Sequence, residues 1–383
     1  MFGHLFRLIW NKRRRNILLL TEMLISFLVL FAVFTLMVYY WHNYHRPEGI
    51  EYEDVWVINF NTPPAYGNTD SLSAFYAQMK RELKGLPLVR EVSLTGLNYP
   101  FSRGRNMMGN IEQYRVGDGY KEILGLRMQE GRWFTAGDAF SRDRTVVLTA
   151  ALKAQLFGGG DAVGKRIDMI FKQMLVIGVL ADIKSRGDYA PPVVADFMLL
   201  DSGDYPQLRN VLVRMAPGAT AVEEGRIYKT MTHLLQSSDV NIEHLSNKLQ
   251  DLNRQSIIPV SIVLIVACFL LINVALGLFG VLWYTINQRR TEIGLRRAVG
   301  ATGWAISGQM IGEAFVLASL SLAVGCFFAL QFPLLKVFDL PAVVYLEAMG
   351  LAVAGIYLLV LICSVYPGRQ AAGIYPAAAL HED

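Results

Sequence analysis

The sequence predicts a membrane protein with four transmembrane α-helices, one before and three after an α+β extracytoplasmic domain of two lobes on a helical stalk. The main observation is that apolar residues, which make up 53% of the 383 residues, gather into four long runs. A helix needs about 20 apolar residues to cross a hydrocarbon layer of roughly 30 Å. The four runs meet that length: Ile17–Tyr40, Ile257–Tyr284, Ala305–Leu335 and Val343–Tyr366.

The first apolar run differs from a cleaved signal peptide. The apolar core of a signal peptide has about 7–15 residues and ends at a site of small residues. This run is longer and ends at Tyr39, Tyr40 and Trp41, which form an aromatic belt of the kind found at membrane surfaces. We therefore expect it to remain in the membrane as an anchor.

The distribution of charge predicts the orientation. Basic residues without any acid precede the first run, and arginines dominate the link between the second and third runs, whereas residues 42–255 carry 25 basic and 25 acidic residues. Because basic flanks stay in the cytoplasm, we expect both termini inside. The expected segments are a cytoplasmic N-terminus 1–16, transmembrane helix 17–41, the extracytoplasmic domain 42–255, transmembrane helix 257–285, a cytoplasmic coupling loop 286–304, transmembrane helix 305–335, an extracytoplasmic link 336–344, transmembrane helix 345–366 and a cytoplasmic tail 367–383.

The extracytoplasmic domain alternates between strand and helix patterns. We expect an initial β-α-β unit, an inserted second lobe over 111–185, and a stalk helix over 239–256 that leads into the second apolar run with Pro259 as its only break. Strands are predicted at Val55–Phe60, Val89–Thr95, Ile111–Val116, Thr145–Thr149, Arg166–Phe171, Met174–Leu180 and Asn210–Met215. Helices are predicted at Asp70–Lys84, Ala150–Phe157 and Thr220–Gln236. The first of these helices has an apolar side, formed by Leu72, Phe75, Tyr76, Met79 and Leu83.

No motif in the sequence supports catalysis, metal binding or a bound cofactor. Gly159, Gly164 and Lys165 have the spacing of a phosphate-binding loop, but Arg166 stands where Ser or Thr is needed to hold magnesium, so a glycine turn is expected. The histidines lack the spacing of metal ligands, and the three cysteines all lie in apolar runs. The net charge of +4 comes from the basic flanks, where anionic lipid attracts them, so no nucleic-acid partner is expected.

Polar side chains inside the apolar runs are the first group of candidate functional residues. They are Glu22, Asn273, Gln309 and Glu313. Such groups are costly in a bilayer and are functional candidates for that reason. The alternative is that the carboxylates reach the membrane surface or bond to a neighbouring helix, and that the asparagine bonds across a helix interface.

The segment 288–304 supplies the second group, because it sets apolar side chains between arginines although it is expected in water. Its candidate residues are Arg289, Arg290, Glu292, Ile293, Gly294, Leu295, Arg296, Arg297 and Gly300. Two interpretations fit this pattern equally. One is a helix that lies on the membrane surface through its apolar side; the other is a docking helix for a cytoplasmic partner.

This segment, Gln288 to Ala301, resembles the signature loop of FtsX/MacB-type ABC transporter permeases. Gln309 and Glu313 match the polar positions that follow the loop in that family. Tyr366 to Leu380 resembles the closing segment of the family, with its two prolines and terminal Ala-Leu. Parts of the extracytoplasmic domain resemble the MacB-like core domain, among them Glu130–Phe134, Val163–Ile167 and Val176–Val179.

The resemblance implies mechanotransmission, in which a dimeric cytoplasmic ABC ATPase closes on ATP and the loop passes the motion to the extracytoplasmic domain. The cargo would be a lipoprotein, peptide or antimicrobial, and the location the inner membrane of a bacterium. Further implied partners are a second permease copy or a paralogue, membrane lipid, and a cargo or adaptor protein. Since only 16 residues precede the first run, we expect a separate ATPase subunit. Two alternatives remain open, an FtsX-like scaffold that activates a cell-wall hydrolase and a sensor of antimicrobial peptides.

Overall fold

The computed structural model describes residues 13–61, 69–102, 107–141, 143–169, 172–236 and 239–373. The chain divides into two compact units. The membrane unit contains the chain up to His42 together with the chain from Ile257 onward, and the second unit is Asn43–Ser256. Each unit is described by itself below.

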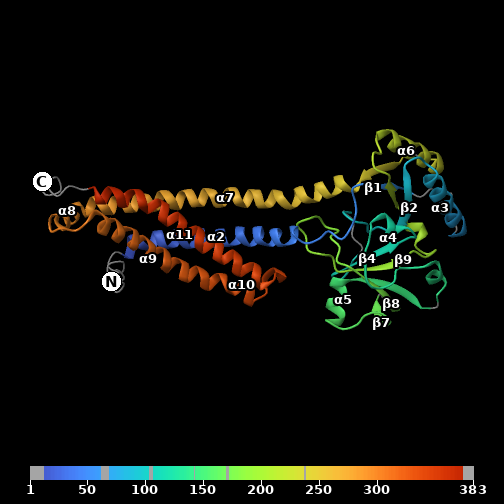
Figure 1. The fold of residues 1–383 in the computed structure, drawn as a ribbon, viewed down its shortest axis with the longest axis horizontal. Coiled ribbons are helices and arrows are strands. Elements are labelled where there is room, and N and C mark those ends of the chain that lie inside the picture. The colour runs from blue at the N-terminus through green and yellow to red at the C-terminus, as the bar shows by residue number, and fades with distance from the viewer. Residues whose placement is uncertain are drawn as a thin grey trace. The chain divides into compact units, whose positions relative to one another are not determined.

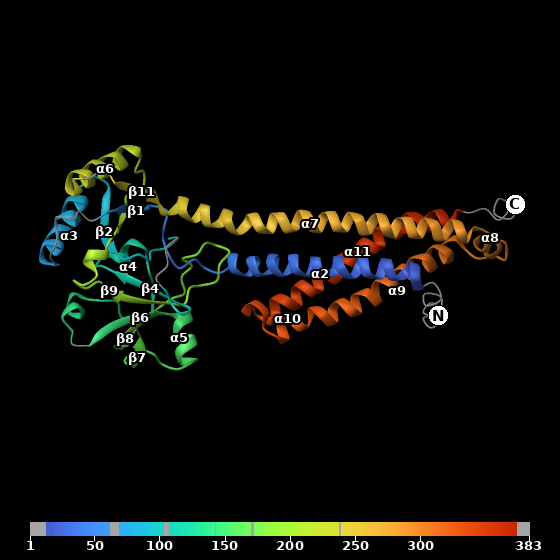
Figure 2. The ribbon, with the colours of Figure 1, turned by 180° about the vertical axis from the view of Figure 1, so that it is seen from behind.

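Four helices in the described residues are long and apolar enough to cross a membrane, which confirms the predicted arrangement of one helix before and three after the domain (Figures 1 and 2). They are α2 (Arg13–Tyr44), α7 (Leu245–Gln288), α9 (Gly303–Ala329) and α11 (Ala342–Ala372). Three short elements connect them: α8 (Arg290–Ala298), α10 (Gln331–Leu334) and the 3-10 turn η3 (Val337–Asp339).

Small side chains allow close packing within the membrane unit. A Cβ added at Gly325 of α9 would come within 2.4 Å of the Phe27 ring on α2, so only glycine permits this approach. Ala314 and Ala318 of α9 and Ala348 of α11 are buried in the same apolar core. Helices in lipid associate through such close contact, because lipid tails are as apolar as the side chains.

Two of the long helices continue through a proline. Helix α7 begins at Leu245 and runs through Pro259, and α11 continues through Pro367 to Ala372. A proline inside a helix removes one backbone hydrogen bond, a cost that packing offsets at Pro367, which is buried. The predicted start of the tail at 367 therefore lies inside a helix, and residues 374–383 fall outside the described residues.

The Asn43–Ser256 unit is built on one mixed sheet of eleven strands. The strand order is β11-β1-β10-β2-β4-β9-β6-β8-β5, with β3 paired to β4 and β7 paired to β8. The strands are β1 (Val55–Phe60), β2 (Val89–Thr95), β3 (Met107–Met108), β4 (Ile111–Val116), β5 (Met128–Gly131), β6 (Arg144–Thr149), β7 (Arg166–Met169), β8 (Lys172–Leu180), β9 (Ala195–Leu199), β10 (Asn210–Met215) and β11 (Val240–His244). The remaining elements are helices α3 (Thr69–Lys84), α4 (Tyr120–Ile123), α5 (Ala150–Phe157) and α6 (Ala221–Leu235) and the 3-10 turns η1 (Ala136–Phe140) and η2 (Tyr205–Gln207).

The first part of the sheet is covered on one face by α3 and α6 (Figure 1). Trp56 and Ile58 of β1 point to this face, and their neighbours Val55 and Val57 point to the other, as the two-residue period of a strand requires. The predicted apolar side of α3 is confirmed. Its residues Leu72, Phe75, Tyr76, Met79 and Leu83 are all buried against the sheet.

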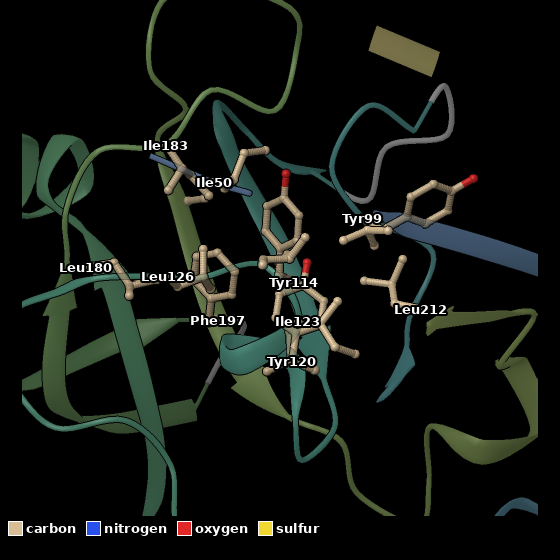
Figure 3. Packing of buried hydrophobic residues seen from close by; sticks show 14 of the residues in the cluster. Ile50, Tyr99, Tyr114, Tyr120, Ile123, Leu126, Leu180, Ile183, Phe197 and Leu212 are labelled. Carbon is tan, nitrogen blue, oxygen red and sulfur yellow. The ribbon is translucent and has the colours of Figure 1, made fainter. Parts of the chain in front are cut away.

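The opposite face carries a second apolar core that reaches both parts of the sheet. Figure 3 shows Tyr114 of β4 and Phe197 of β9 at its centre, where their rings stack at 4.8 Å between centroids. Leu245 and Leu249, in the first turns of α7, belong to the same core. Helix α7 is therefore anchored in the Asn43–Ser256 unit by packing before it continues into the membrane unit.

The structure corrects four details of the predicted domain. The expected β-α-β unit is split, because β10 lies between β1 and β2 and is antiparallel to both. Residues 240–244, which were expected in the stalk helix, form strand β11, so the helix begins at Leu245 and not at 239. The second lobe does not end at 185, since β9 pairs with both β4 and β6. Strands β3, β5 and β9 were not predicted, because they are short and lie in segments without a clear alternation.

Asp196 is a fully buried carboxylic acid at the second position of β9. Neither of its carboxyl oxygens has a hydrogen-bond partner among the described residues, and the same holds for Nε2 of Gln113, its register partner in β4. Burial raises the pKa of Asp196 to about 7, against the opposing effect of the Arg115 charge. The carboxyl group is therefore partly protonated at neutral pH.

We predict that stability falls as the pH rises from about 4 to about 7, because the folded protein keeps a proton at Asp196 that the unfolded chain releases near pH 4. A pKa near 7 instead of near 4 corresponds to roughly 4 kcal/mol. Asp196→Asn, which stays neutral, should raise the thermal unfolding midpoint at pH 8 and change it little at pH 4.5. Melting curves of the full chain at both pH values test this. Equal effects at the two pH values would exclude the carboxylate charge as the cause.

Candidate functional site

The candidate site lies at the end of the membrane unit where α7 ends, α8 turns back and α9 begins. Arg289, between α7 and α8, faces Glu313 of α9, and its Nη1 atom donates to Oε1 at 3.1 Å and to Oε2 at 3.2 Å. The two side chains are 13% and 16% exposed. Gln309, one turn before Glu313 on α9, donates from Nε2 to Oε1 at 3.3 Å.

Arginines of α8 extend this polar network. Nη1 of Arg296 donates to Oε1 of Gln309 at 2.9 Å, and its Nη2 donates to the Glu292 carboxylate one turn earlier. Nη1 of Arg297 donates at 2.9 Å to the backbone oxygen of Ala372 at the end of α11, where a cation also interacts favourably with the helix dipole. Gln309 and Glu313 of the first predicted group therefore bond to Arg289 and Arg296 of the second group and join α8 to α9, while Arg297 joins α8 to α11.

Ile293 and Gly294 are buried within this end of the unit rather than exposed on α8. Ile293 is 2% exposed and packs with Ile286, Ile306 and Ala371, which come from α7, α9 and α11. Ile293, one of the candidate residues, is therefore not accessible to a membrane surface or to a partner. Its burial holds α8 firmly against the three long helices.

The apolar side chains that α8 and its flanks leave exposed are Leu295, Val299 and Trp304. Val299 is 83% and Trp304 is 89% exposed. Trp304 was not among the predicted candidate residues, because a tryptophan at the start of an apolar run is also the usual membrane-surface anchor. What distinguishes it is its place in the first turn of α9, just after the α8 turn.

A tight turn connects α8 to α9. Gly300 has a φ of +104°, a conformation that side chains with a Cβ rarely adopt, so a glycine is required here. Thr302 then caps α9 by accepting a hydrogen bond from the backbone nitrogen of Ala305. Arg290, the remaining candidate of this segment, lies at the first residue of α8.

Glu22 and Asn273 lie away from this network. Glu22 of α2 rests against Gly277 of α7, where an added Cβ would approach its Oε2 atom to 2.9 Å. Asn273 is exposed and donates from Nδ2 to the backbone oxygen of Phe269 in its own helix at 2.8 Å. The expected bond of Asn273 across a helix interface is therefore not formed within the described part of this chain.

The Asn43–Ser256 unit contains two adjoining cavities of about 660 Å³ each, which share Leu199, Leu200 and Tyr205. One is lined by Trp133 and Phe134, and the other by the Arg144–Asp201 ion pair at 3.0 Å, among other residues. No group of three or more His, Cys, Asp or Glu side chains that could hold a metal ion occurs in the described residues.

Two family models together match most of the chain. Residues 20–224 match the MacB-like periplasmic core domain, and residues 264–376 match the FtsX-like permease C-terminal domain. The chain belongs to the MacB/FtsX family of ABC transporter permeases. The network around Arg289 and Glu313 lies within the FtsX-like part, and the core-domain match covers strands β1 to β10 of the sheet.

Known relatives of this permease include proteins with and without an ATP-binding part in their names. The ABC transporter permease YvrN of Bacillus subtilis is 25% identical over 323 residues, which cover 78% of this chain and 77% of that protein. The macrolide export ATP-binding/permease protein MacB of Chromobacterium violaceum is 26% identical over 291 residues, which cover 73% of this chain and 44% of that protein. The alignment thus spans less than half of the length of this MacB relative.

Among solved structures, the periplasmic region of MacB from Actinobacillus actinomycetemcomitans aligns with a TM-score of 0.37 and 16% sequence identity. The alignment covers 54% of this chain and 94% of that structure.

We predict that Glu313→Ala lowers the thermal unfolding midpoint of the detergent-solubilised permease, because it leaves Arg289 largely buried without its anionic partner. Loss of one partner of a buried pair costs about 3–5 kcal/mol, and this partly exposed pair should lie near the lower end. The double variant Arg289→Met/Glu313→Met should cost less than the two single changes together.

Glu347→Ala is the matched control for Glu313→Ala. It removes the ion pair between Glu347 and His42, in which the His42 side chain is 40% exposed and the Glu347 side chain 47% exposed. Such exposed pairs contribute little to stability. If Glu347→Ala and Glu313→Ala shift the midpoint equally, the Arg289–Glu313 pair has no special role in holding this end together.

Proposed function

We propose that this permease is the membrane subunit of an ABC-type mechanotransmission complex, in which α8 and its flanks dock on a cytoplasmic ABC ATPase. The observation that carries the proposal is the exposure of three apolar side chains, Leu295 on α8, Val299 just after it and Trp304 at the start of α9, in a segment that is otherwise fixed by buried contacts. Apolar and aromatic anchors surrounded by charged side chains are typical of the energetic centre of a protein interface.

The contacts of α8 support transmission of force rather than a flexible tether. Ile293 packs among α7, α9 and α11, Arg297 is bonded to the end of α11, and Arg289 is paired with α9. A displacement of α8 by a closing ATPase would therefore move three helices together. Helix α7 continues without interruption to Leu245, which is buried in the core of the Asn43–Ser256 unit, and so offers a continuous path for the motion.

The arginines of α8 support a cytoplasmic position for this end, since basic flanks are retained on that side of the membrane. The Asn43–Ser256 unit would then lie outside, in the periplasm if the inner membrane is the location. We propose that it acts there on a lipoprotein, peptide or antimicrobial cargo. Its two adjoining cavities are candidate contact surfaces for such a cargo or an adaptor protein.

We also propose that the chain is non-catalytic and holds no cofactor, with ATP bound by the partner. The similarity to YvrN, a protein named as a permease alone and matched over 77% of its length, supports this proposal.

A second permease copy or a paralogue is the proposed partner within the membrane. In the most apolar 18-residue stretch of α7, only 17% is buried, compared with 44% in the corresponding stretch of α2. Much of the surface of α7 is therefore available for contact with another chain. Asn273 lies on this exposed surface. An amide in hydrocarbon gains from a hydrogen bond across a helix interface, which favours α7 as part of a dimer contact.

We predict that Val299→Asp and Trp304→Ala each reduce co-purification of an ABC ATPase from the native host at least tenfold. The reason is that loss of a central apolar anchor typically costs about 2 kcal/mol or more of binding free energy. Mass spectrometry of the affinity-purified permease measures the ratio of ATPase to permease.

Leu334→Ala serves as the control for the docking variants, because Leu334 is also an exposed apolar residue but lies on α10, after the other end of α9. It should leave ATPase recovery unchanged. Wild-type recovery with both Val299→Asp and Trp304→Ala would refute the docking role of this surface, provided that each variant elutes as the folded protein in size-exclusion chromatography.

We predict that Asn273→Leu weakens self-association in lipid by about threefold to thirtyfold, which corresponds to roughly 0.6–2 kcal/mol for an interhelical hydrogen bond. Energy transfer between labelled copies, measured at several lipid-to-protein ratios, gives the dimer fraction. Asn273→Gln keeps an amide and should retain most of the association. An unchanged dimer fraction with Asn273→Leu would remove this residue from the interface.

A further inference from the structure

The membrane unit contains a groove of about 770 Å³ at the end away from α8. One wall is α2, through residues that include Ala32 and Leu36, and the other is formed by the end of α9 with α10, through Phe328 and Phe332. Phe338, in η3, and Tyr345, near the start of α11, complete it. All these elements belong to one compact unit, so the groove does not depend on the Asn43–Ser256 unit.

The surface of the groove is almost entirely apolar, and three of the polar side chains that line it donate to backbone oxygens. Thr35 donates its hydroxyl to the backbone oxygen of Phe31 at 2.7 Å, and the Tyr345 hydroxyl donates to the backbone oxygen of Val337. Gln331 donates from Nε2 to the backbone oxygen of Phe327 at 3.4 Å. A peptide or a water chain needs hydrogen-bond partners in such a place, so the chemistry of the walls favours an occupant without polar groups.

The link that borders the groove has an unusual backbone. Lys336, Phe338 and Asp339 have φ values of +49°, +62° and +51°, in the left-handed region that residues with a Cβ rarely adopt. Strain of this kind persists where the surroundings hold it and is often found at binding sites. Here it turns the Phe338 side chain to the groove, although that side chain is otherwise largely exposed.

We propose that this groove binds one acyl chain of a membrane phospholipid, with the ring of Phe338 packed over the chain. The groove lies between apolar helices that are long enough to cross a membrane, so lipid acyl chains surround its opening. Its volume lies in the range of small-molecule pockets, about 300–1,000 Å³. A helix of a second copy, about 10 Å across and 30 Å long in the hydrocarbon, has a volume of about 2,400 Å³ and does not fit inside.

The site is distinct from the proposed ATPase contact and does not rest on it. A bound chain would fill the space between α2 and the α9–α10 end, where protein contacts alone leave a gap. The chain would therefore act as part of the packing of this unit, exchanging more slowly than the surrounding lipid.

The test compares the permease with an Ala32→Trp variant, whose indole would occupy the groove from its open side. Both are purified in the same mild detergent with extended washing, and retained phospholipid is counted per chain by native mass spectrometry. We expect the unaltered protein to keep one phospholipid more than the variant. Adding back phosphatidylethanolamine should raise the unfolding midpoint of the unaltered protein and leave that of Ala32→Trp unchanged.

Ala354→Trp, at an exposed position of α11 outside the groove, is the matched control and should behave like the unaltered protein. Phe338→Ala should retain less phospholipid without any added bulk, so the proposal stays testable even if Ala32→Trp does not fold. Equal phospholipid retention by the unaltered protein and Phe338→Ala would overturn the proposal. A change of oligomeric state in Ala32→Trp, without loss of phospholipid, would also overturn it by making the groove a protein interface.

Discussion

The absence of water in the membrane interior is the constraint on which the rest of the membrane unit depends. Every charged group that lies between the helices needs a partner from the protein itself. The pairing of Arg289 with Glu313 meets this need and at the same time fixes the turn between α7 and α9. With that turn held, Val299 and Trp304, which follow α8, are exposed while Ile293 of α8 stays buried. The ion pair thus acts together with the packing of Ile293 and the Arg297–Ala372 hydrogen bond to position the candidate site.

The same constraint explains why the helices pack through small residues. Without a hydrophobic driving force in lipid, stability comes from close contact, and Gly325 against Phe27 and the buried alanines of α9 provide it. Where the packing is incomplete, as between α2 and α10, the surrounding lipid is the natural material to fill the space. The two ends of this unit therefore differ, with a dense polar network at the α8 end and an apolar groove at the other.

The Asn43–Ser256 unit is stabilised in a different way, because water surrounds it and an ordinary apolar core can form. Its sheet is continuous, yet two joints are narrow: β2 meets β4 at a single residue pair, and β6 meets β9 at two. The stacked rings of Tyr114 and Phe197 join β4 to β9, the two strands that lie between these joints. Asp196 lies at the second joint, where it pairs in register with Leu148, and its buried carboxyl group has no hydrogen-bond partner among the described residues.

Local pattern in the sequence was enough to determine the four membrane helices, the apolar side of α3 and the family, because these depend on length, periodicity and short motifs. It also identified Arg289, Arg296, Gln309 and Glu313 as unusual polar residues. Only the tertiary structure decided that these residues bond to one another, that Ile293 is buried, and that Trp304 is exposed beside them. The physical reason is that the partners lie on different helices, and contacts between helices leave no periodic signal in the chain. The short strand β9 shows the same limit, since its pairing with β4 and β6 exists only once the sheet has formed.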